Sequence, residues 1–370
     1  MTVPFFSLSD QVKSLRTEFI AAITDVIDTQ GFANGPAVKK FEDELAAYLG
    51  TKHVIAVNTG TTALHAALIG LGVGPGDDVV TVAHTWISTC WAVSYAGASP
   101  VFCDVDERTF GLDARLLERA ITPKTKAILP VHLHGHPVDL DGIMEIANRK
   151  GIPVIEDTAQ SVGSKYRGRH TGTFGHVNAT SFYPSKNLGA FGEGGAVMTD
   201  DDDIAARIRR LRDHAQTSRH VHSELGYNWR LDGVQGAVLS IKLKHLDAWN
   251  ARRRVIAARY IAGLEGLPGL VVGRDQPWAE CNWHVFPVFH ARRDALRTAL
   301  EARGVQTGVH YPTPVHLQPA YAHLGLGIGT LPVSERLAAT ELSLPMFAEL
   351  TDRQVETTIA AVRAACEALG

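Results

Sequence analysis

Residues 53–83 read HVIAVNTGTTALHAALIGLGVGPGDDVVTVA. The apolar runs His53–Val57 and Asp78–Ala83 have the length and β-branched content of strands. Between them, Thr61–Leu71 has the composition of a helix, and turns rich in glycine stand on both sides of it. A strand, a helix and a second strand in this order predict a βαβ unit with two parallel strands.

The same alternation continues along the first two thirds of the chain. Further strands are expected at Val101–Val105, Ala127–Val131 and Ile152–Ile155, and helices near Ile87–Ala96, at Asp113–Ala120 and at Asp141–Lys150. This order is typical of an α/β fold whose mostly parallel sheet carries helices on both faces.

The last third of the chain changes character. One long helix is predicted from a cap at Asp232 to about Leu264, and the Gly- and Pro-containing stretch Gly266–Pro277 follows it. We therefore expect a large domain over residues 1–250 and a smaller C-terminal α/β domain over residues 251–370. The amphipathic segment Gln11–Thr29 is expected to pack across the two domains.

Composition excludes several classes of protein. The chain has 370 residues and a net charge of −3, which predicts no binding to nucleic acid or to anionic lipid. Its start, Met1–Phe6, has no basic region before the apolar residues, and no run of 18 apolar residues occurs, so neither secretion nor a membrane span is expected. Four scattered cysteines without a CxxC pair indicate reduced thiols in a cytoplasmic protein.

The first candidate motif is Asn58–Leu64, where a strand ends and a helix opens with hydroxyl residues. Free N–H groups and the positive end of the helix dipole make such a terminus suitable for a phosphate group. An ordinary helix cap by Thr59 or Thr61 explains the same residues. The glycines of residues 70–76 end a helix and precede a strand, so they do not form a dinucleotide-binding turn.

The second motif is Ile152–Gln160, with Glu156 and Asp157 at the end of a buried strand. Ligands of open α/β sheets bind at the carboxyl ends of strands, and a buried carboxylate there needs a cation as partner. A protonated pyridine nitrogen would supply that cation, although Asp157 would equally serve as the cap of a following helix.

The third motif is Thr180–Asn187, which is followed by the turn Gly192–Gly195. Pro184 ends a strand-like run, and Lys186 stands on the loop that follows. A buried amine with a lowered pKa is what Schiff-base formation requires. An amine, an acid and a phosphate-binding helix terminus together predict a site for pyridoxal 5'-phosphate.

At this point the sequence resembles the DegT-type sugar aminotransferases, a family of fold type I. The resemblance covers nearly the whole chain through the motifs Asn58–Leu64, Val131–Asp141, Glu156–Gln160, Ser181–Gly195, Gly226–Gln235 and His310–Tyr321. It implies a central sheet of seven mainly parallel strands. Some relatives carry His in place of the lysine and catalyse dehydration, so Lys186 favours the aminotransferases.

The resemblance also implies a role for individual residues. Lys186 would be the catalytic residue that binds the cofactor covalently, with Asp157 on the ring nitrogen and Gln160 on the phenolic oxygen. The phosphate would be held by Gly60, Thr61 and Ser181, the ring would stack on Trp86, and Asn228 would reach the phosphate from the neighbouring subunit. The active unit would then be a homodimer with shared active sites.

Three alternating histidines, His132, His134 and His136, could in principle share a metal ion. Gly135 and Pro137 interrupt that strand, and we predict no metal site. His310 and Tyr311 open a Pro-rich loop that suits the recognition of sugar hydroxyl groups, and Tyr183 is expected near the reacting carbon.

The expected reaction moves an amino group from glutamate or glutamine to a nucleotide-linked keto-deoxysugar, at C3. This position rests on the resemblance of His310 and Tyr311 to the sugar-contacting pair of the branch that aminates 3-keto sugars, and a 4-keto acceptor stays open. Two alternatives remain: a keto-cyclitol acceptor, as in aminoglycoside pathways, and a regulatory relative that does not turn over.

Overall fold

Six strands and one extended segment form the central sheet of the computed structural model, which describes residues 2–369. In spatial order they are β3 (Ser99–Cys103), β2 (Asp78–Val82), β4 (Thr125–Ile128), the segment 154–157, β7 (Asn178–Ser181), β8 (Gly195–Thr199) and β1 (His53–Val57). Strand β8 runs antiparallel to both of its neighbours, and the others run in one direction. The expectation of a mainly parallel sheet of seven strands is confirmed.

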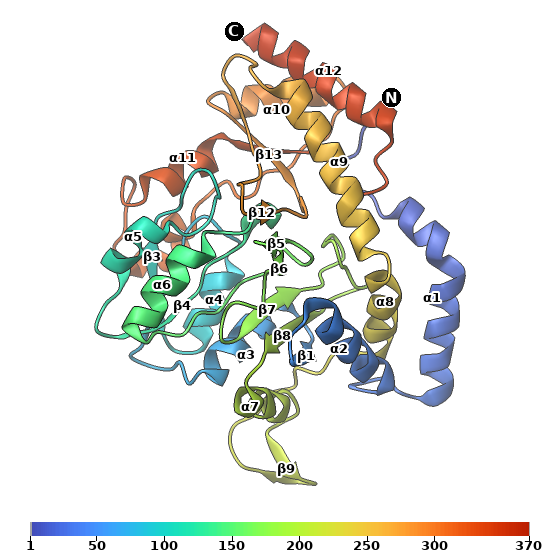
Figure 1. Ribbon diagram of the computed structural model, residues 1–370, viewed down its shortest axis with the longest axis vertical. Coiled ribbons are helices and arrows are strands. Elements are labelled where there is room, and N and C mark those ends of the chain that lie inside the picture. Colours follow the sequence, from blue (N-terminus) through green and yellow to red (C-terminus); the bar gives the residue numbers. More distant parts are fainter. Residues whose placement is uncertain (1, 370) are drawn as a thin grey trace.

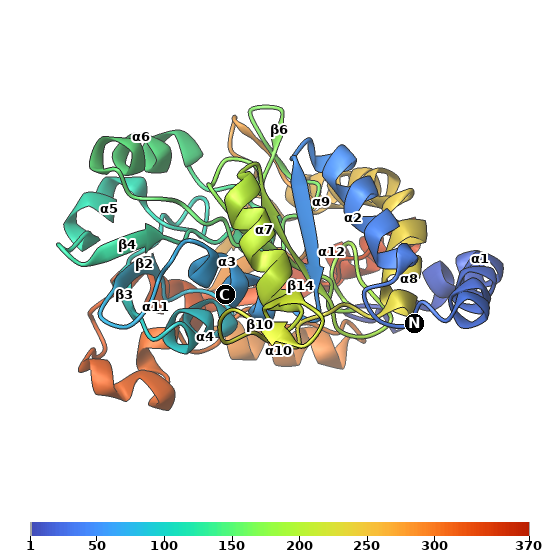
Figure 2. The same ribbon diagram turned by 90° about the horizontal axis from the view of Figure 1, so that it is seen from below.

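Helices cover both faces of this sheet (Figure 2). They are α2 (Pro36–Leu49), α3 (Gly60–Gly70), α4 (Ser88–Tyr95), α5 (Ala114–Ala120), α6 (Leu140–Lys150) and α7 (Asp202–Arg212). Strand β8 is buried at every position, as expected for a strand with helices on both sides. Helix α3 packs against β7 and β8, which sets its first turn beside the end of β7.

The predicted strand Ile152–Ile155 is only partly correct. The segment pairs through isolated bridges, Val154 with Ile128 and Asp157 with both Val131 and Ala179. Toward β4 the segment makes backbone hydrogen bonds, but toward β7 side chains replace part of the ladder, because the N–H groups of Val154 and Glu156 donate to the His176 ring and the Asn178 amide. Strands β3 and β4 start earlier than predicted, and the edge position of β3 tolerates Pro100.

The long helix predicted from Asp232 to Leu264 is wrong in one respect, because it is two helices, α8 (Gly233–Leu243) and α9 (Leu246–Leu264). The N–H groups of Lys244 and His245 each donate to a carbonyl three residues earlier, and this tighter turn separates the helices. The Asp232 side chain makes no capping hydrogen bond.

A second apolar core lies at the other end of the molecule, at the top of Figure 1. It packs the antiparallel strands β11 (Leu270–Val272), β13 (Phe286–His290) and β14 (Glu341–Leu344) against α9, α10 (Arg293–Ala302) and α12 (Asp352–Leu369). Its contribution from α9 starts at Ile256. We therefore propose that the smaller domain begins within α9, close to the predicted boundary after residue 250.

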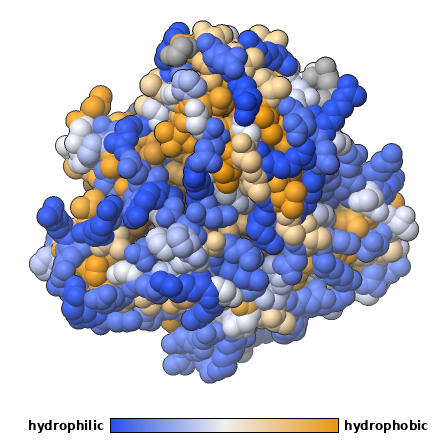
Figure 3. All heavy atoms as spheres, turned by 45° about the horizontal axis from the view of Figure 1, so that its top comes forward, coloured by the Kyte–Doolittle hydropathy of each residue, from blue (hydrophilic) through white to orange (hydrophobic). Residues whose placement is uncertain are grey.

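The remaining elements connect these two cores or lie at the surface. They are α1 (Ser9–Thr29), the small sheet of β5 (Lys165–Tyr166), β6 (Arg169–His170) and β12 (Ala279–Glu280), the hairpin of β9 (Gln216–Ser218) and β10 (Val221–His222), and α11 (Pro332–Thr340). Most of the face in Figure 3 is hydrophilic. Within residues 2–369, every helix is too short or too polar to cross a lipid bilayer.

Candidate active site

A cavity of about 640 Å³ opens where the predicted motifs meet. Its lining includes ten of the eleven predicted site residues: Gly60, Thr61, Trp86, Asp157, Gln160, Ser181, Tyr183, Lys186, His310 and Tyr311. They come from the strand ends and from the loop that follows β13 and α10. Segments more than 200 residues apart in the chain therefore build one site, as Gly60 and His310 illustrate.

One end of the cavity is the first turn of α3. Thr59 caps this helix, because its hydroxyl oxygen accepts a 2.9 Å hydrogen bond from the N–H of Thr62. Gly60 lies so close to Ser181 that an added Cβ would be 2.5 Å from the Cβ of Ser181. The helix therefore caps itself through Thr59, and the absence of a side chain at Gly60 leaves a cradle between the helix terminus and β7.

The acid at the floor of the cavity is Asp157. It is 4% exposed, and burial raises the pKa of its carboxyl group, while two hydrogen bonds and the charge of Lys186 oppose that rise. Oδ2 accepts a 2.9 Å hydrogen bond from the Thr89 hydroxyl, and Oδ1 accepts one of 3.1 Å from the N–H of Ala159. A cationic partner in the cavity would stabilise this carboxylate.

Lys186 lies on the loop after β7, and its backbone N–H donates a 2.8 Å hydrogen bond to the backbone carbonyl of Tyr183. Burial lowers the pKa of its amine to about 8, and the negative charge of Asp157 limits the fall. About a tenth of the amine is therefore in the uncharged, nucleophilic form at pH 7, far more than for a free lysine.

A hydrogen-bonded chain crosses the cavity wall at Gln160. Its Oε1 accepts a 2.6 Å bond from the N–H of His134, and its Nε2 donates a 3.1 Å bond to Oη of Tyr311. The Tyr311 ring lies 5.2 Å from that of Trp86, centroid to centroid. Trp86 itself is 54% exposed, so one face of this ring system is open.

The three alternating histidines do not converge. Nε2 of His132 lies 2.9 Å from Oε2 of Glu156 in a fully buried pair, and His134 bonds the carbonyl oxygen of His310 at 3.1 Å. Glu156 also accepts from three N–H groups of residues 172–175, so this pair fixes the loop behind Asp157. Within residues 2–369, one group of three potential metal ligands lies close together, namely His136, Asp275 and Cys281, and it does not line the cavity.

The sequence analysis gave no role to Thr89, Ser185, Glu193 and His284, which also line the cavity. Thr89 lies at the start of α4, a helix whose position was predicted. The position of Thr89 within that predicted helix could have indicated that its side chain faces the site. No local pattern indicates His284, because it approaches Lys186 only through the fold.

Asn228 is the one predicted residue that does not line the cavity of a single chain. It is exposed, and it pairs with Asp213 through an isolated antiparallel bridge. Its predicted role toward the phosphate therefore requires a second chain.

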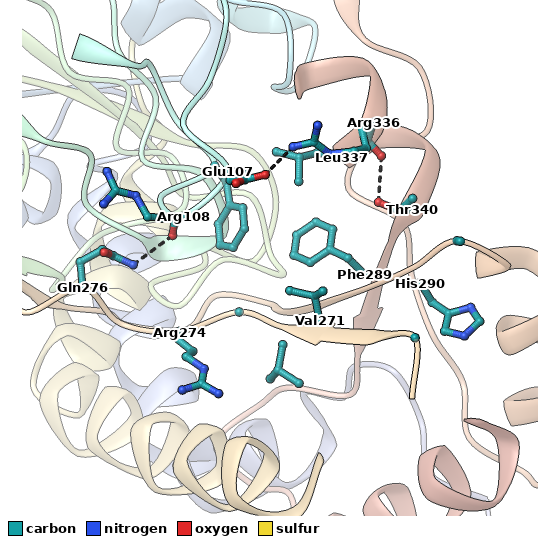
Figure 4. Close-up of a pocket in the computed structure, with 15 residues that line it drawn as sticks. Glu107, Arg108, Val271, Arg274, Gln276, Phe289, His290, Arg336, Leu337 and Thr340 are labelled. Atoms are coloured by element: carbon teal, nitrogen blue, oxygen red, sulfur yellow. Dashed lines mark hydrogen bonds and ion pairs between the residues drawn. The ribbon is translucent and has the colours of Figure 1, made fainter. Parts of the chain in front are cut away.

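A second cavity, of about 470 Å³, lies between residues 107–110 and the elements β11, β13 and α11 (Figure 4). Its three arginines are each paired with a carboxylate: Arg108 with Asp106, Arg274 with Glu265 and Arg336 with Glu107. Phe110 and Phe289 stack at 5.2 Å in its wall. These pairings leave the cavity at Lys186 as the candidate active site.

A model of the DegT/DnrJ/EryC1/StrS aminotransferase family matches residues 13–363. The chain belongs to this family. It is 48% identical to the dTDP-3-amino-3,4,6-trideoxy-alpha-D-glucose transaminase of Streptomyces venezuelae over 98% of this chain and 95% of the relative. It is 40% identical to the UDP-2-acetamido-2-deoxy-3-oxo-D-glucuronate aminotransferase of Pseudomonas aeruginosa over 97% of this chain and 99% of the relative.

A solved structure of a similar protein has the same fold as this chain. The crystal structure of S. venezuelae DesV in complex with a ketimine intermediate matches at a TM-score of 0.97 with 48% identity, over 99% of both chains. The fold class and the aminotransferase activity expected from the sequence are thereby confirmed.

Aminotransferases of the DegT/DnrJ/EryC1/StrS family depend on pyridoxal phosphate, and the cavity fits that cofactor. Lys186 offers an amine of lowered pKa, Asp157 offers a buried carboxylate in need of a cation, and Gly60 leaves space at the start of α3. When bound, the cofactor supplies an electron sink that weakens a C–H bond of the amino-group donor.

Proposed function

We propose that this aminotransferase moves an amino group from glutamate or glutamine to C3 of a nucleotide-linked 3-keto-deoxysugar. The observation that carries the proposal is the joint placement of Lys186, Asp157 and the α3 terminus in one cavity of a chain closely similar to 3-amino-sugar transaminases. The names of the two relatives above share a 3-amino or 3-oxo position, whereas their nucleotides differ. We favour the dTDP sugar because the relative with the higher identity acts on it.

In this proposal each group of the chain has one task. Lys186 would hold the cofactor and, as a free amine, would be the base that takes the proton from the donor carbon bearing the amino group. Asp157 keeps the ring nitrogen protonated, which its hydrogen bonds with Thr89 and Ala159 support by holding the carboxylate in place. Gly60, Thr61 and Ser181 hold the phosphate, Trp86 stacks on the ring, and Gln160 contacts the phenolic oxygen.

The sugar would be recognised by Tyr183, His310 and Tyr311. All three line the same cavity as Lys186, and they offer neutral donors and acceptors to hydroxyl and keto groups. Burial raises the pKa of Tyr311 and lowers that of His310 to about 4, so both side chains are uncharged near neutral pH.

We also propose a homodimer in which Asn228 of one subunit completes the site of the other. The mouth of the cavity carries Trp86 and Tyr183, which are 54% and 50% exposed. Large aromatic groups of this kind are commonly covered at interfaces between subunits.

We also propose a cytoplasmic location. The four cysteines are free and buried, which supports this location.

The experiment runs the reaction backwards. The enzyme receives nucleotide-linked 3-amino or 4-amino deoxysugars with 2-oxoglutarate, and the glutamate formed is measured. Glutamate from the 3-amino sugar is expected. Glutamate from the 4-amino sugar alone would overturn the C3 assignment, and a reaction only with an amino-cyclitol would support the cyclitol alternative. A protein that binds the cofactor but transfers no amino group would support the regulatory alternative.

A further inference from the structure

His310 is hydrogen-bonded to a buried pair, Glu341 and Ser343, that the proposed function does not use. Glu341 and Ser343 lie two residues apart on β14, both 0% exposed. Gly308 bonds Ser343 through both backbone groups, at 3.0 and 2.9 Å, and this pairing sets the segment of His310 directly beside the strand.

Three hydrogen bonds connect these residues into a closed set. Nδ1 of His310 lies 2.9 Å from Oγ of Ser343, and the Ser343 hydroxyl donates to Oε1 of Glu341. The other carboxylate oxygen, Oε2, accepts a 2.6 Å bond from the backbone N–H of His310. Glu341 forms no ion pair with any residue between 2 and 369. Arg293 of α10 pairs with Asp294, and toward Glu341 it donates only to the backbone carbonyl oxygen.

The chemistry of the set dictates the direction of its hydrogen bonds. A serine hydroxyl has one proton to donate. While Glu341 is ionised, that proton points to the carboxylate, and Oγ of Ser343 must accept from His310. The His310 proton then sits on Nδ1, and Nε2 has a lone pair. If Glu341 is protonated on Oε1, both bonds reverse, and the His310 proton sits on Nε2.

We propose that His310, Ser343 and Glu341 form a proton relay, through which Nε2 of His310 exchanges a proton with a hydroxyl or keto oxygen of the bound sugar. A proton that arrives at Nε2 releases the one on Nδ1 to Ser343, and Ser343 passes its own proton to Glu341. One proton enters at the cavity and one is added to the carboxylate, so the imidazole stays neutral throughout. The proposal rests on the proposed function, since it assigns a proton-transfer role to a sugar-binding residue.

The surroundings explain why a relay has an advantage over a charged imidazole. Burial and the positive charge of Lys186 together lower the pKa of His310, so the imidazolium form is disfavoured. Burial raises the pKa of Glu341 to about 7, opposed by its bonds to Ser343 and His310 and by the charge of Arg293. Other titratable groups near the relay are His84, His134, His284, Tyr311 and Lys186, and each of them contacts His310 or interacts with its charge.

The direct test reads the tautomer of His310 in the cofactor-loaded enzyme without sugar. Protein with ¹⁵N-labelled histidine is compared with His310→Asn, which identifies the two ring-nitrogen signals of His310. At pH 8.5 the proton is expected on Nδ1. In Glu341→Gln the amide donates to Ser343, so Ser343 must donate to Nδ1, and the proton is expected on Nε2 at pH 8.5.

Activity gives a second readout. In Glu341→Gln and Ser343→Ala, kcat/KM for the sugar should fall about a hundredfold, a size typical of lost proton transfer, with a smaller change for the amino-acid half-reaction. Wild-type enzyme should show an ionisation near pH 7 in the sugar half-reaction that Glu341→Gln lacks. Glu367→Gln, an exposed acid on α12, is the control and should behave as wild type.

The two readouts separate the relay from the proposed function. An Nε2 proton in the wild-type enzyme at pH 8.5, or an unchanged tautomer in a folded Glu341→Gln protein, would overturn the relay even if amine transfer is normal. A sugar half-reaction of unchanged rate and pH profile in both variants would overturn it as well. Absence of any transfer to sugar would instead overturn the proposed function.

Discussion

The Thr89 hydroxyl donates a 2.9 Å hydrogen bond to Oδ2 of Asp157, inside a wall where both side chains are buried. Asp157 lies at the end of the sheet segment 154–157, and Thr89 lies on α4. The bond therefore fixes the orientation of the acid from a separate element, and the chain also places Thr85 within 3.0 Å of the Thr89 hydroxyl.

Thr89→Val should keep the fold and weaken the site. The valine has nearly the same shape but donates no hydrogen bond, so the Asp157 carboxylate loses a partner and its pKa rises further. We expect kcat to fall about tenfold or more, since a hydrogen bond to a charged group contributes about 1.5–3 kcal/mol. Thr85→Val removes only the outer hydroxyl and serves as the matched control. Equal losses in both variants would contradict a specific role for the bond to Asp157.

Gly60→Ala should reduce the affinity for pyridoxal phosphate. The added Cβ would lie 2.5 Å from the Cβ of Ser181 and 2.9 Å from its hydroxyl oxygen, so the first turn of α3 must shift away from β7. Such a shift displaces the N–H groups at the helix terminus, and we expect cofactor affinity to fall about tenfold or more. Titration of the apoenzyme with the cofactor measures this.

The matched control for that substitution is Gly74→Ala. Gly74 lies in the turn after α3, and a Cβ there would meet no atom within 4 Å. Its affinity for the cofactor should equal that of the wild type. An unchanged affinity in Gly60→Ala would remove the α3 terminus from the phosphate site.

The motifs were predictable because each is local. A strand followed by a glycine turn and a helix predicts a terminus such as that at Gly60, and acids at a strand end predict Asp157. The separation of α8 from α9 was not predictable, because the turn at Lys244 and His245 leaves the apolar pattern uninterrupted. Glu341 and Ser343 were also missed, because their relation to His310 depends on pairing between distant segments.

Loading of the apoenzyme with pyridoxal phosphate should depend on the ionisation of Lys186. Only the neutral amine reacts with an aldehyde, and burial lowers its pKa to about 8, so the loading rate should rise with pH and level off above 8. Asp157→Asn removes the charge that raises this pKa, so the midpoint should move below 8. Absorbance of the bound cofactor records the rate.

Lys186→Ala is the control for the site of attachment. It should lose covalent attachment and at least about a thousandfold in transamination, roughly 4 kcal/mol in the barrier. Borohydride reduction and peptide mapping of the wild type should find the cofactor on Lys186. A midpoint that moves upward in Asp157→Asn would show that another group controls loading.

Subunit exchange tests whether Asn228 serves the neighbouring site. Asn228 is exposed and lies outside the cavity lining of its own chain, so the proposed dimer must bring it to the partner's cofactor. Lys186→Ala and Asn228→Asp proteins should each be inactive or nearly so. In a mixed dimer, the intact Lys186 of one chain meets the intact Asn228 of the other, and one of the two sites is repaired. Equal amounts after random exchange give half mixed dimers, so activity should recover to about a quarter of the wild type.

Native mass spectrometry measures the fraction of mixed dimers. If mixed dimers form without recovery, Asn228 acts within its own subunit or not at the cofactor.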